Sequence, residues 1–302
     1  MTWLWIPLTI GAALLQSLRS AVQRHLTRVL STNGATFTRF AYGLPLAVLY
    51  ILLLTEGLGS AWPSPAKDFW LWVATGSIAQ ILATALLLLV FRWKNFAVGV
   101  AYAKTEVVQA ALFGLVFLGE HVTWLGALAI LLGTMGVMLF SLKQDAHPLR
   151  AFLTGWLERP ALLGLVSAAL FGVSAVGFRA ASLSLGHQSP IVAAAFTLAC
   201  SAAIQTAMMA LYLRLREPGQ ITKVAKAWRL ASLSGITGIV GSAGWFTAMT
   251  LQQVAYVRTL GLIEMLFTFA IAVLFFKEHP RRAEILGIAL LVAAIGLVLN
   301  VR

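Results

Sequence analysis

The sequence predicts an all-α integral membrane protein with ten transmembrane helices, built as two inverted five-helix repeats. Three observations lead to this prediction: an apolar composition, apolar stretches long enough to cross a bilayer, and an internal duplication. The 302 residues are 60% hydrophobic and only 11% charged, whereas a soluble domain carries about 25% charged residues. With a mean hydropathy of +0.89, most of the surface is expected to face lipid.

The apolar stretches are expected to be helices. In lipid every backbone N–H and C=O must be hydrogen-bonded within the protein, so only helices and closed barrels span a membrane. Continuous runs such as Ile81–Val90 lack the alternation of a barrel strand. The ten predicted spans are Thr2–Val22, Gly34–Leu54, Phe69–Phe91, Phe96–Leu118, Val122–Leu142, Ala161–Ala181, Ile191–Leu213, Arg229–Thr250, Val254–Phe276 and Ala283–Val301.

The second half of the chain repeats the first with an offset of about 156 to 159 positions. Ala12–Leu14 aligns with Ala168–Leu170, and Glu106–His121 aligns with Glu264–His279. The second pair of segments keeps two glutamates and a histidine at the same spacing, which chance explains poorly.

The duplication divides the chain into a first repeat of residues 1–142, a linking loop of residues 143–160 and a second repeat of residues 161–302. Five is an odd number of spans, so the second repeat must enter the membrane from the opposite side. Inverted repeats of this kind are typical of secondary transporters, whose binding site lies near the bilayer midplane.

These segments resemble a known family. Thr105–Leu112 followed by Leu118–Glu120, and their second copy Ile263–Glu278, are similar to the helix-four signature of the drug/metabolite transporter superfamily, EamA type. Arg39 resembles an arginine that these proteins often carry in helix two. The resemblance implies a transporter of small metabolites such as amino acids, more often as export than import.

The resemblance also implies a packing. The halves would form a pseudo-two-fold pair around a central cavity lined by helices one to four and six to nine, with helices five and ten peripheral. The family often has a proline after the first glutamate, whereas this chain has Val107 and Met265. The sequence therefore gives no proline-based reason for helix four or nine to break.

Charged side chains inside the spans are costly in lipid and are the candidates for function. Glu106 and Glu264 lie near the centres of helices four and nine, so we expect them to bind substrate or carry a coupled proton. The alternative is a structural ion pair that holds the bundle together. Leaving aside the first two positions of each span, the spans hold seven charged residues: Arg19, Arg39, Lys104, Glu106, Arg179, Arg258 and Glu264.

Lys104 is either a site residue or a counter-ion to another helix, because its spacing from Glu106 points the two side chains to different faces. Gln109 is the expected same-face neighbour of Glu106. Arg39 is a candidate through the resemblance. The other arginines lie near span ends, where their guanidinium groups can reach the interface.

Helix eight carries glycines at every third position from Gly235 to Gly244, a pattern that favours close helix packing and also allows flexing. Trp245 beside them could form an aromatic wall for substrate, face lipid or pack in the core.

Other chemistry is not expected. Glu120-His121 and Glu278-His279 have no companion ligands, so helix-ending turns are favoured over metal sites. Cys200 lies within an apolar run. No phosphate-binding loop, hydrolase elbow or zinc motif occurs, so we predict no enzyme, cofactor or metal. The chain has a net charge of +12, and most of its Lys and Arg residues lie in the loops. This distribution indicates an orientation in the membrane and not nucleic-acid binding.

Three functions follow in order of preference. The first is a secondary transporter of a small polar metabolite, and the second is a proton-coupled multidrug or cation exporter. Small multidrug relatives carry their essential glutamate in helix one, whereas Thr2–Val22 and Ala161–Ala181 contain no acid. The third is a membrane enzyme or non-transporting scaffold. The expected partners are the substrate, a proton and lipid; the oligomeric state is open.

The basic residues predict an orientation in a bacterial-type inner membrane. The odd-numbered loops hold fifteen Lys and Arg, whereas the even loops and tails hold only Lys67 and Arg302. The positive-inside rule places both termini outside the cytoplasm, opposite to what the resemblance implies. Within the spans, five basic and two acidic residues predict a cavity that favours an anionic or zwitterionic solute.

Overall fold

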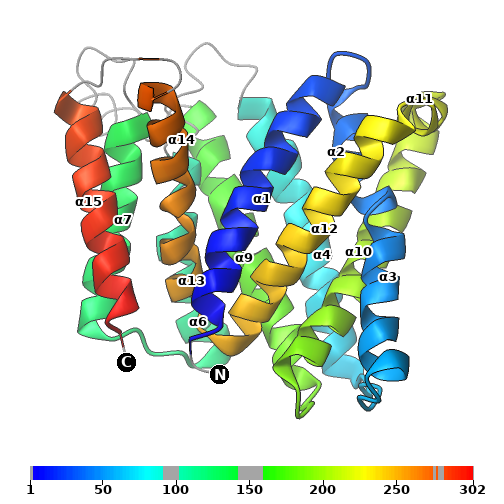
Figure 1. Ribbon diagram of the computed structural model, residues 1–302, viewed down its shortest axis with the longest axis horizontal. Helices are drawn as coiled ribbons and strands as arrows, with labels where there is room; N and C mark the ends of the chain where they lie inside the picture. The colour runs from blue at the N-terminus through cyan, green and yellow to red at the C-terminus, as the bar shows by residue number, and fades with distance from the viewer. Residues whose placement is uncertain (1–2, 91–101, 142–158, 275–276, 278–281, 302) are drawn as a thin grey trace. The chain divides into compact units, whose positions relative to one another are not determined.

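The computed structural model describes residues 3–90, 102–141, 159–274, 277 and 282–301 (Figure 1). Those residues form helices joined by turns and loops, and no strand occurs among them. The all-α prediction is therefore confirmed for the described part of the chain.

The chain divides into two compact units that do not coincide with the predicted repeats. Unit 1 comprises residues 1–78 and 177–251, and unit 2 comprises residues 79–176 and 252–302. Each unit thus draws helices from both halves of the sequence. The unit boundaries fall inside two long helices, α4 (Lys67–Val90) and α9 (Arg159–Ser184).

The described residues of unit 1 form seven helical elements besides its parts of α4 and α9. They are α1 (Trp5–Leu26), α2 (Thr32–Ala41), α3 (Leu44–Leu52) with the π-turn η1 (Leu53–Gly57), α10 (Pro190–Arg216), α11 (Gln220–Lys226) and α12 (Trp228–Leu251). Helix α12 runs beside α1 and also packs on α2, α3 and α10 (Figure 1).

The glycines of α12 let it approach α1 and α2 closely. A Cβ added at Gly235 would lie 2.5 Å from the Cβ of Tyr42, and one at Gly244 would lie 3.0 Å from the Cβ of Ala12. A side chain at Gly235 would clash, and one at Gly244 would make a contact tighter than ordinary van der Waals packing. The predicted role of the glycine stripe in close helix packing is confirmed.

The described residues of unit 2 include the helices α6 (Glu106–Leu118), α7 (Trp124–Ser141), α13 (Val254–Gly261), α14 (Ile263–Leu274) and α15 (Arg282–Leu299). Helices α7 and α15 pack together at a glycine, where a Cβ on Gly136 would lie 2.7 Å from the carbonyl oxygen of Gly287. The apolar core of this unit joins α6, α7, α13 and α15.

Five helical stretches of the described residues are long and apolar enough to cross a membrane: 32–57, 67–90, 159–184, 190–216 and 282–299. Each corresponds to one of the ten predicted spans. The full ten-span, inverted-repeat arrangement stays a prediction. The predicted loop of residues 143–160 lies outside the described residues, except for Arg159 and Pro160 at the start of α9.

Three predicted spans are interrupted. Gly34–Leu54 bends at Gly43, where a Cβ would lie 2.4 Å from the carbonyl oxygen of Arg39, so only glycine fits. The described part of Phe96–Leu118 turns at Lys104–Thr105, and Val254–Phe276 turns at Leu262. The last two interruptions position the candidate site.

Candidate functional site

Helices four and nine of the predicted order break immediately before their glutamates. Glu106 is the first residue of α6, and Glu264 is the second residue of α14. The two glutamates are equivalent in the duplication, so the same break occurs once in each repeat.

Neither break needs a proline, because backbone and side-chain groups stabilise the turns. The N–H of Thr105 donates to the Tyr102 carbonyl at 3.1 Å, and the Thr105 hydroxyl donates to the same oxygen at 2.6 Å. In the second repeat, the N–H of Leu262 donates to the Thr259 carbonyl at 3.2 Å and that of Met265 to the Leu262 carbonyl at 2.9 Å. Such three-residue spacing tightens a helix locally.

The second turn is anchored in the core of unit 2. Leu262 is 6% exposed and packs with Val107 of α6 and Ile130 of α7. Gly133 of α7 faces it, and a Cβ there would lie 2.9 Å from a methyl carbon of Leu262. Packing therefore fixes the turn where the sequence shows no helix breaker.

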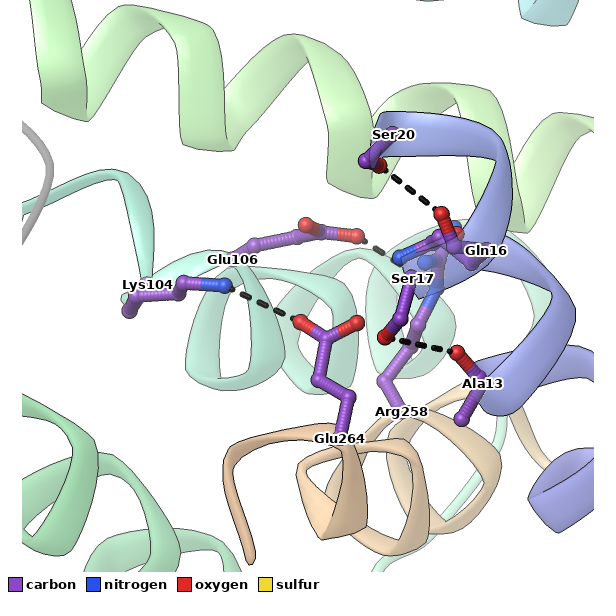
Figure 2. A network of polar contacts seen from close by, with 8 residues as sticks. All are labelled: Ala13, Gln16, Ser17, Ser20, Lys104, Glu106, Arg258 and Glu264. Atoms are coloured by element: carbon purple, nitrogen blue, oxygen red, sulfur yellow. Dashed lines mark hydrogen bonds and ion pairs between the residues drawn. The ribbon is translucent and has the colours of Figure 1, made fainter. Parts of the chain in front are cut away.

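Four charged side chains from the two broken helices form crossed ion pairs (Figure 2). Lys104 Nζ lies 3.3 Å from Glu264 Oε1, and Arg258 Nε lies 3.3 Å from Glu106 Oε1. Each broken helix contributes one cation and one carboxylate, and each pair joins one helix to the other. Figure 2 also shows Ser17 and Ser20 of α1, whose hydroxyls donate to carbonyls of their own helix.

The four side chains are mostly buried, but each keeps some exposed surface that a solute can contact. Lys104 is 28% exposed and Glu264 16%, whereas Arg258 and Glu106 are 18% and 19% exposed. Both carboxylates also lie in the first turn of a helix, where the positive end of the helix dipole stabilises negative charge. Two cations and two carboxylates leave the cluster formally neutral.

Gln109 has other partners than expected. Its amide donates to the Thr105 hydroxyl at 2.9 Å and to the Leu165 carbonyl of α9 at 3.4 Å. It therefore links the start of α6 to α9, and no hydrogen bond to Glu106 is among these contacts.

Arg39 and Trp245 belong to unit 1. Arg39 lies in the last turn of α2 with its guanidinium carbon 5.0 Å from the ring centroid of Phe40, and its stem packs on Gly238 of α12 beside that of Arg19. Trp245 is 8% exposed, so the interpretation that it faces lipid is wrong.

The expected excess of positive charge is not found in the crossed ion pairs. Lys104 and Arg258 each face a glutamate, and Arg179 donates to the carbonyls of Met249 and Thr250 at the end of α12. The partly buried Arg179 thus satisfies carbonyl groups at the C-terminal end of α12.

The segment Glu120-His121 follows the end of α6. Gly119 has a left-handed backbone with φ of 66°, and the Glu120 N–H donates to the Gly114 carbonyl at 3.1 Å. This is the hydrogen bond of a glycine-capped helix end, so the predicted helix-ending turn is confirmed. Glu278 and His279 lie outside the described residues.

Arg258 is the residue of the site that sequence reasoning did not select. It lies near the predicted start of helix nine, which favoured an interfacial position. The charge balance of the two spans could have indicated it. They hold two glutamates, and Lys104 is their only cation besides Arg258. Two buried carboxylates require two counter-charges.

Comparison with known proteins agrees with this architecture. Residues 159–300 match the model of the EamA-like transporter family, which confirms the resemblance predicted from the glutamate segments. The matched range covers residues 161–300 of the second predicted repeat and includes Arg258 and Glu264. This part of the chain is thus similar to membrane transporters of the EamA-like kind.

A solved structure described as "Crystal structure of protein" has the same fold. It superposes with a TM-score of 0.69 at 16% sequence identity, covering 97% of this chain and 94% of that chain. At this identity the likeness concerns the fold alone. No curated protein matches the sequence.

Proposed function

We propose that this chain is a membrane transporter of the EamA-like kind, and more specifically a secondary active transporter that exports a small polar metabolite. The substrate is an amino acid or a related anionic or zwitterionic solute. Movement occurs by alternating access between two inverted five-helix repeats, residues 1–142 and 161–302. The chain lies in a bacterial-type inner membrane with both termini outside the cytoplasm.

The crossed ion pairs are the observation that supports this proposal. Charged groups within a membrane span are costly and are kept where they have a function. Here four charged side chains meet where two helices break, near the N-termini of α6 and α14. They are partly exposed, so a solute can contact them. Broken helices that present charged ends to a ligand are the usual construction of transporter sites.

The neutrality of the cluster favours a zwitterion. Two unit charges 4 Å apart interact by about 4 kcal/mol at an effective dielectric constant of 20, so an unmatched charge in this cluster is strongly disfavoured. A zwitterion can place its carboxylate beside Lys104 or Arg258 and its ammonium beside the glutamate released from that cation. Every charge then keeps an opposite neighbour.

A substrate with a net negative charge would change the net charge of the cluster. If its carboxylate took the place of Glu264 beside Lys104, the cluster would hold one more negative than positive charge unless a proton entered with the anion. An anionic substrate is therefore carried together with one proton. A lipophilic monocation would instead displace Lys104 or Arg258 from a glutamate and leave that cation unmatched, so it is rejected.

The test is transport by the purified protein in proteoliposomes. A panel of labelled zwitterionic amino acids, carboxylates and a lipophilic cation is compared in exchange assays. We expect amino acids to exchange without a pH gradient and monoanions to require one. Transport of the lipophilic cation alone would contradict the proposal, as would a lack of transport for the whole panel in vesicles that contain folded protein.

A further inference from the structure

One end of unit 1 presents a surface of cations that the crossed ion pairs do not involve. Its members are exposed basic residues of the α1–α2 connection, the last turn of α10, helix α11 and the start of α12: Arg28, Arg214, Arg216, Lys223, Lys226 and Arg229. We call this set the basic surface. We propose that it binds the headgroups of anionic phospholipids.

The short helix α11 sets the geometry of the basic surface. It follows α10 after a three-residue turn and packs on α2, α10 and α12 (Figure 1). Gln220 and Val224 face inward, with 6% and 3% exposure, whereas Lys223 and Lys226 are exposed. Helix α11 therefore lies across the end of the spanning helices with its cations outward.

A turn contact brings Arg28 to the same end. Ser31, the N-cap of α2, and Asn33, in the first turn of α2, donate to the two carboxylate oxygens of Glu217, with the Asn33 bond at 2.7 Å. Glu217 is the only acid between Arg214 and Arg229. Its carboxylate is thus occupied in joining the two turns, and the surrounding cations outnumber it.

Apolar side chains border the cations, as a surface at the membrane interface requires. Leu215 is 68% exposed, Ile221 38% and Trp228 57%. The guanidinium carbon of Arg229 lies 5.6 Å from the ring centroid of Trp228. Tryptophan and arginine together are typical of the headgroup region, where a tryptophan can insert among acyl chains while the cation meets a phosphate.

Charge complementarity selects the lipid class. Basic residues near a membrane surface attract anionic lipids, whereas zwitterionic lipids offer no net charge. The opposite end of unit 1 differs, because it carries Glu56, Lys67 and Asp68, so its few charges nearly cancel. We therefore expect lipid preference at one end only, independently of which solute is transported.

The experiment measures lipid binding to the purified full-length chain by native mass spectrometry. Phosphatidylglycerol and phosphatidylcholine with identical acyl chains are titrated against the wild type and against the triple variant Lys223→Ala, Lys226→Ala, Arg229→Ala. The wild type should prefer phosphatidylglycerol at least tenfold. Each removed cation should weaken that binding by about fivefold, and added salt should weaken it further.

Two controls make the result specific. Lys67→Ala removes an exposed cation from the opposite end and should leave the preference unchanged, and Lys223→Arg with Lys226→Arg should retain it. Equal binding of both lipids by the wild type would overturn the proposal, as would a triple variant with wild-type affinity. Competition by soluble glycerol phosphate at the lipid's own concentration would also overturn it, because the site would then bind free anions.

Discussion

At the scale of single residues, the crossed ion pairs make the glutamates and cations interdependent. Replacing Lys104 by glutamate would place two carboxylates together in unit 2, because Lys104 Nζ lies 3.3 Å from Glu264 Oε1. We expect Lys104→Glu to lower the free energy of unfolding by up to about 3 kcal/mol, the low end for a broken buried pair since this one is partly exposed. The exchanged double variant Lys104→Glu with Glu264→Lys should recover most of that loss.

Thermal unfolding in detergent measures this prediction as a double-mutant cycle. The corresponding exchange between Arg258 and Glu106 provides an independent second cycle. If the double variant were as unstable as the sum of the two single variants, the two residues would not be partners.

The sequence predicts which residues are candidates better than it predicts their partners. The depth of Glu106 and Glu264 in their spans follows from counting along the helix, and so does the divergence of Lys104 from Glu106. That Lys104 faces Glu264 depends on how two helices pack across the unit, which no periodicity within one helix reveals. Gln109 shows the same limit, because its acceptors include a carbonyl of α9.

At the scale of elements, the glycines of α12 determine how closely it packs. Gly235→Ala would place a Cβ 2.5 Å from that of Tyr42 and 2.7 Å from the Tyr42 carbonyl carbon, so the backbones must separate. Overpacking of this kind costs about 1–3 kcal/mol, more than the gain of about 1 kcal/mol in helix propensity. The unfolding temperature in detergent should fall.

Gly11→Ala is the matched control for that substitution. Gly11 also lies within a helix, α1, but a Cβ there meets nothing within 4 Å. Helix propensity alone then acts, so this variant should be as stable as the wild type or more stable. If both alanine variants shifted the unfolding temperature equally, the packing of α12 would not depend on Gly235.

The sequence pattern does not predict the helix interruptions. The apolar character of Phe96–Leu118 and Val254–Phe276 predicts continuous spans, and the lack of proline after each glutamate agrees with that. The turns depend instead on the Thr105 hydroxyl and on the packing of Leu262 against α7. These are tertiary interactions, and they interrupt segments whose apolar pattern predicts continuous helices.

At the scale of the whole molecule, the duplication predicts two repeats, whereas the compact units combine helices from both. A sequence repeat indicates that the two halves have a common origin and the same number of spans. It does not state which helices share a core, because that depends on contacts between distant segments such as α1 and α12.

The orientation of the chain is a prediction at this scale. Helix α11 and its cations lie at the end of unit 1 opposite to Trp5, where α1 begins. If that basic end is cytoplasmic, as the positive-inside rule indicates, the N-terminus lies outside. A reporter enzyme active only in the cytoplasm should therefore be silent when fused after Arg302, and active when inserted in the turn between α10 and α11. Activity at Arg302 would reverse the assignment.

The most direct test of the central claim, that the crossed ion pairs bind the transported solute, is exchange of a labelled amino acid by glutamate variants in proteoliposomes. Glu106→Gln and Glu264→Gln each remove one carboxylate from the cluster and should reduce exchange at least tenfold in protein that folds and inserts normally. Glu56→Gln makes the same change at an exposed glutamate that accepts a hydrogen bond from Trp62, and it should exchange at the wild-type rate. Wild-type exchange by both cluster variants would show that the crossed ion pairs do not bind the transported solute.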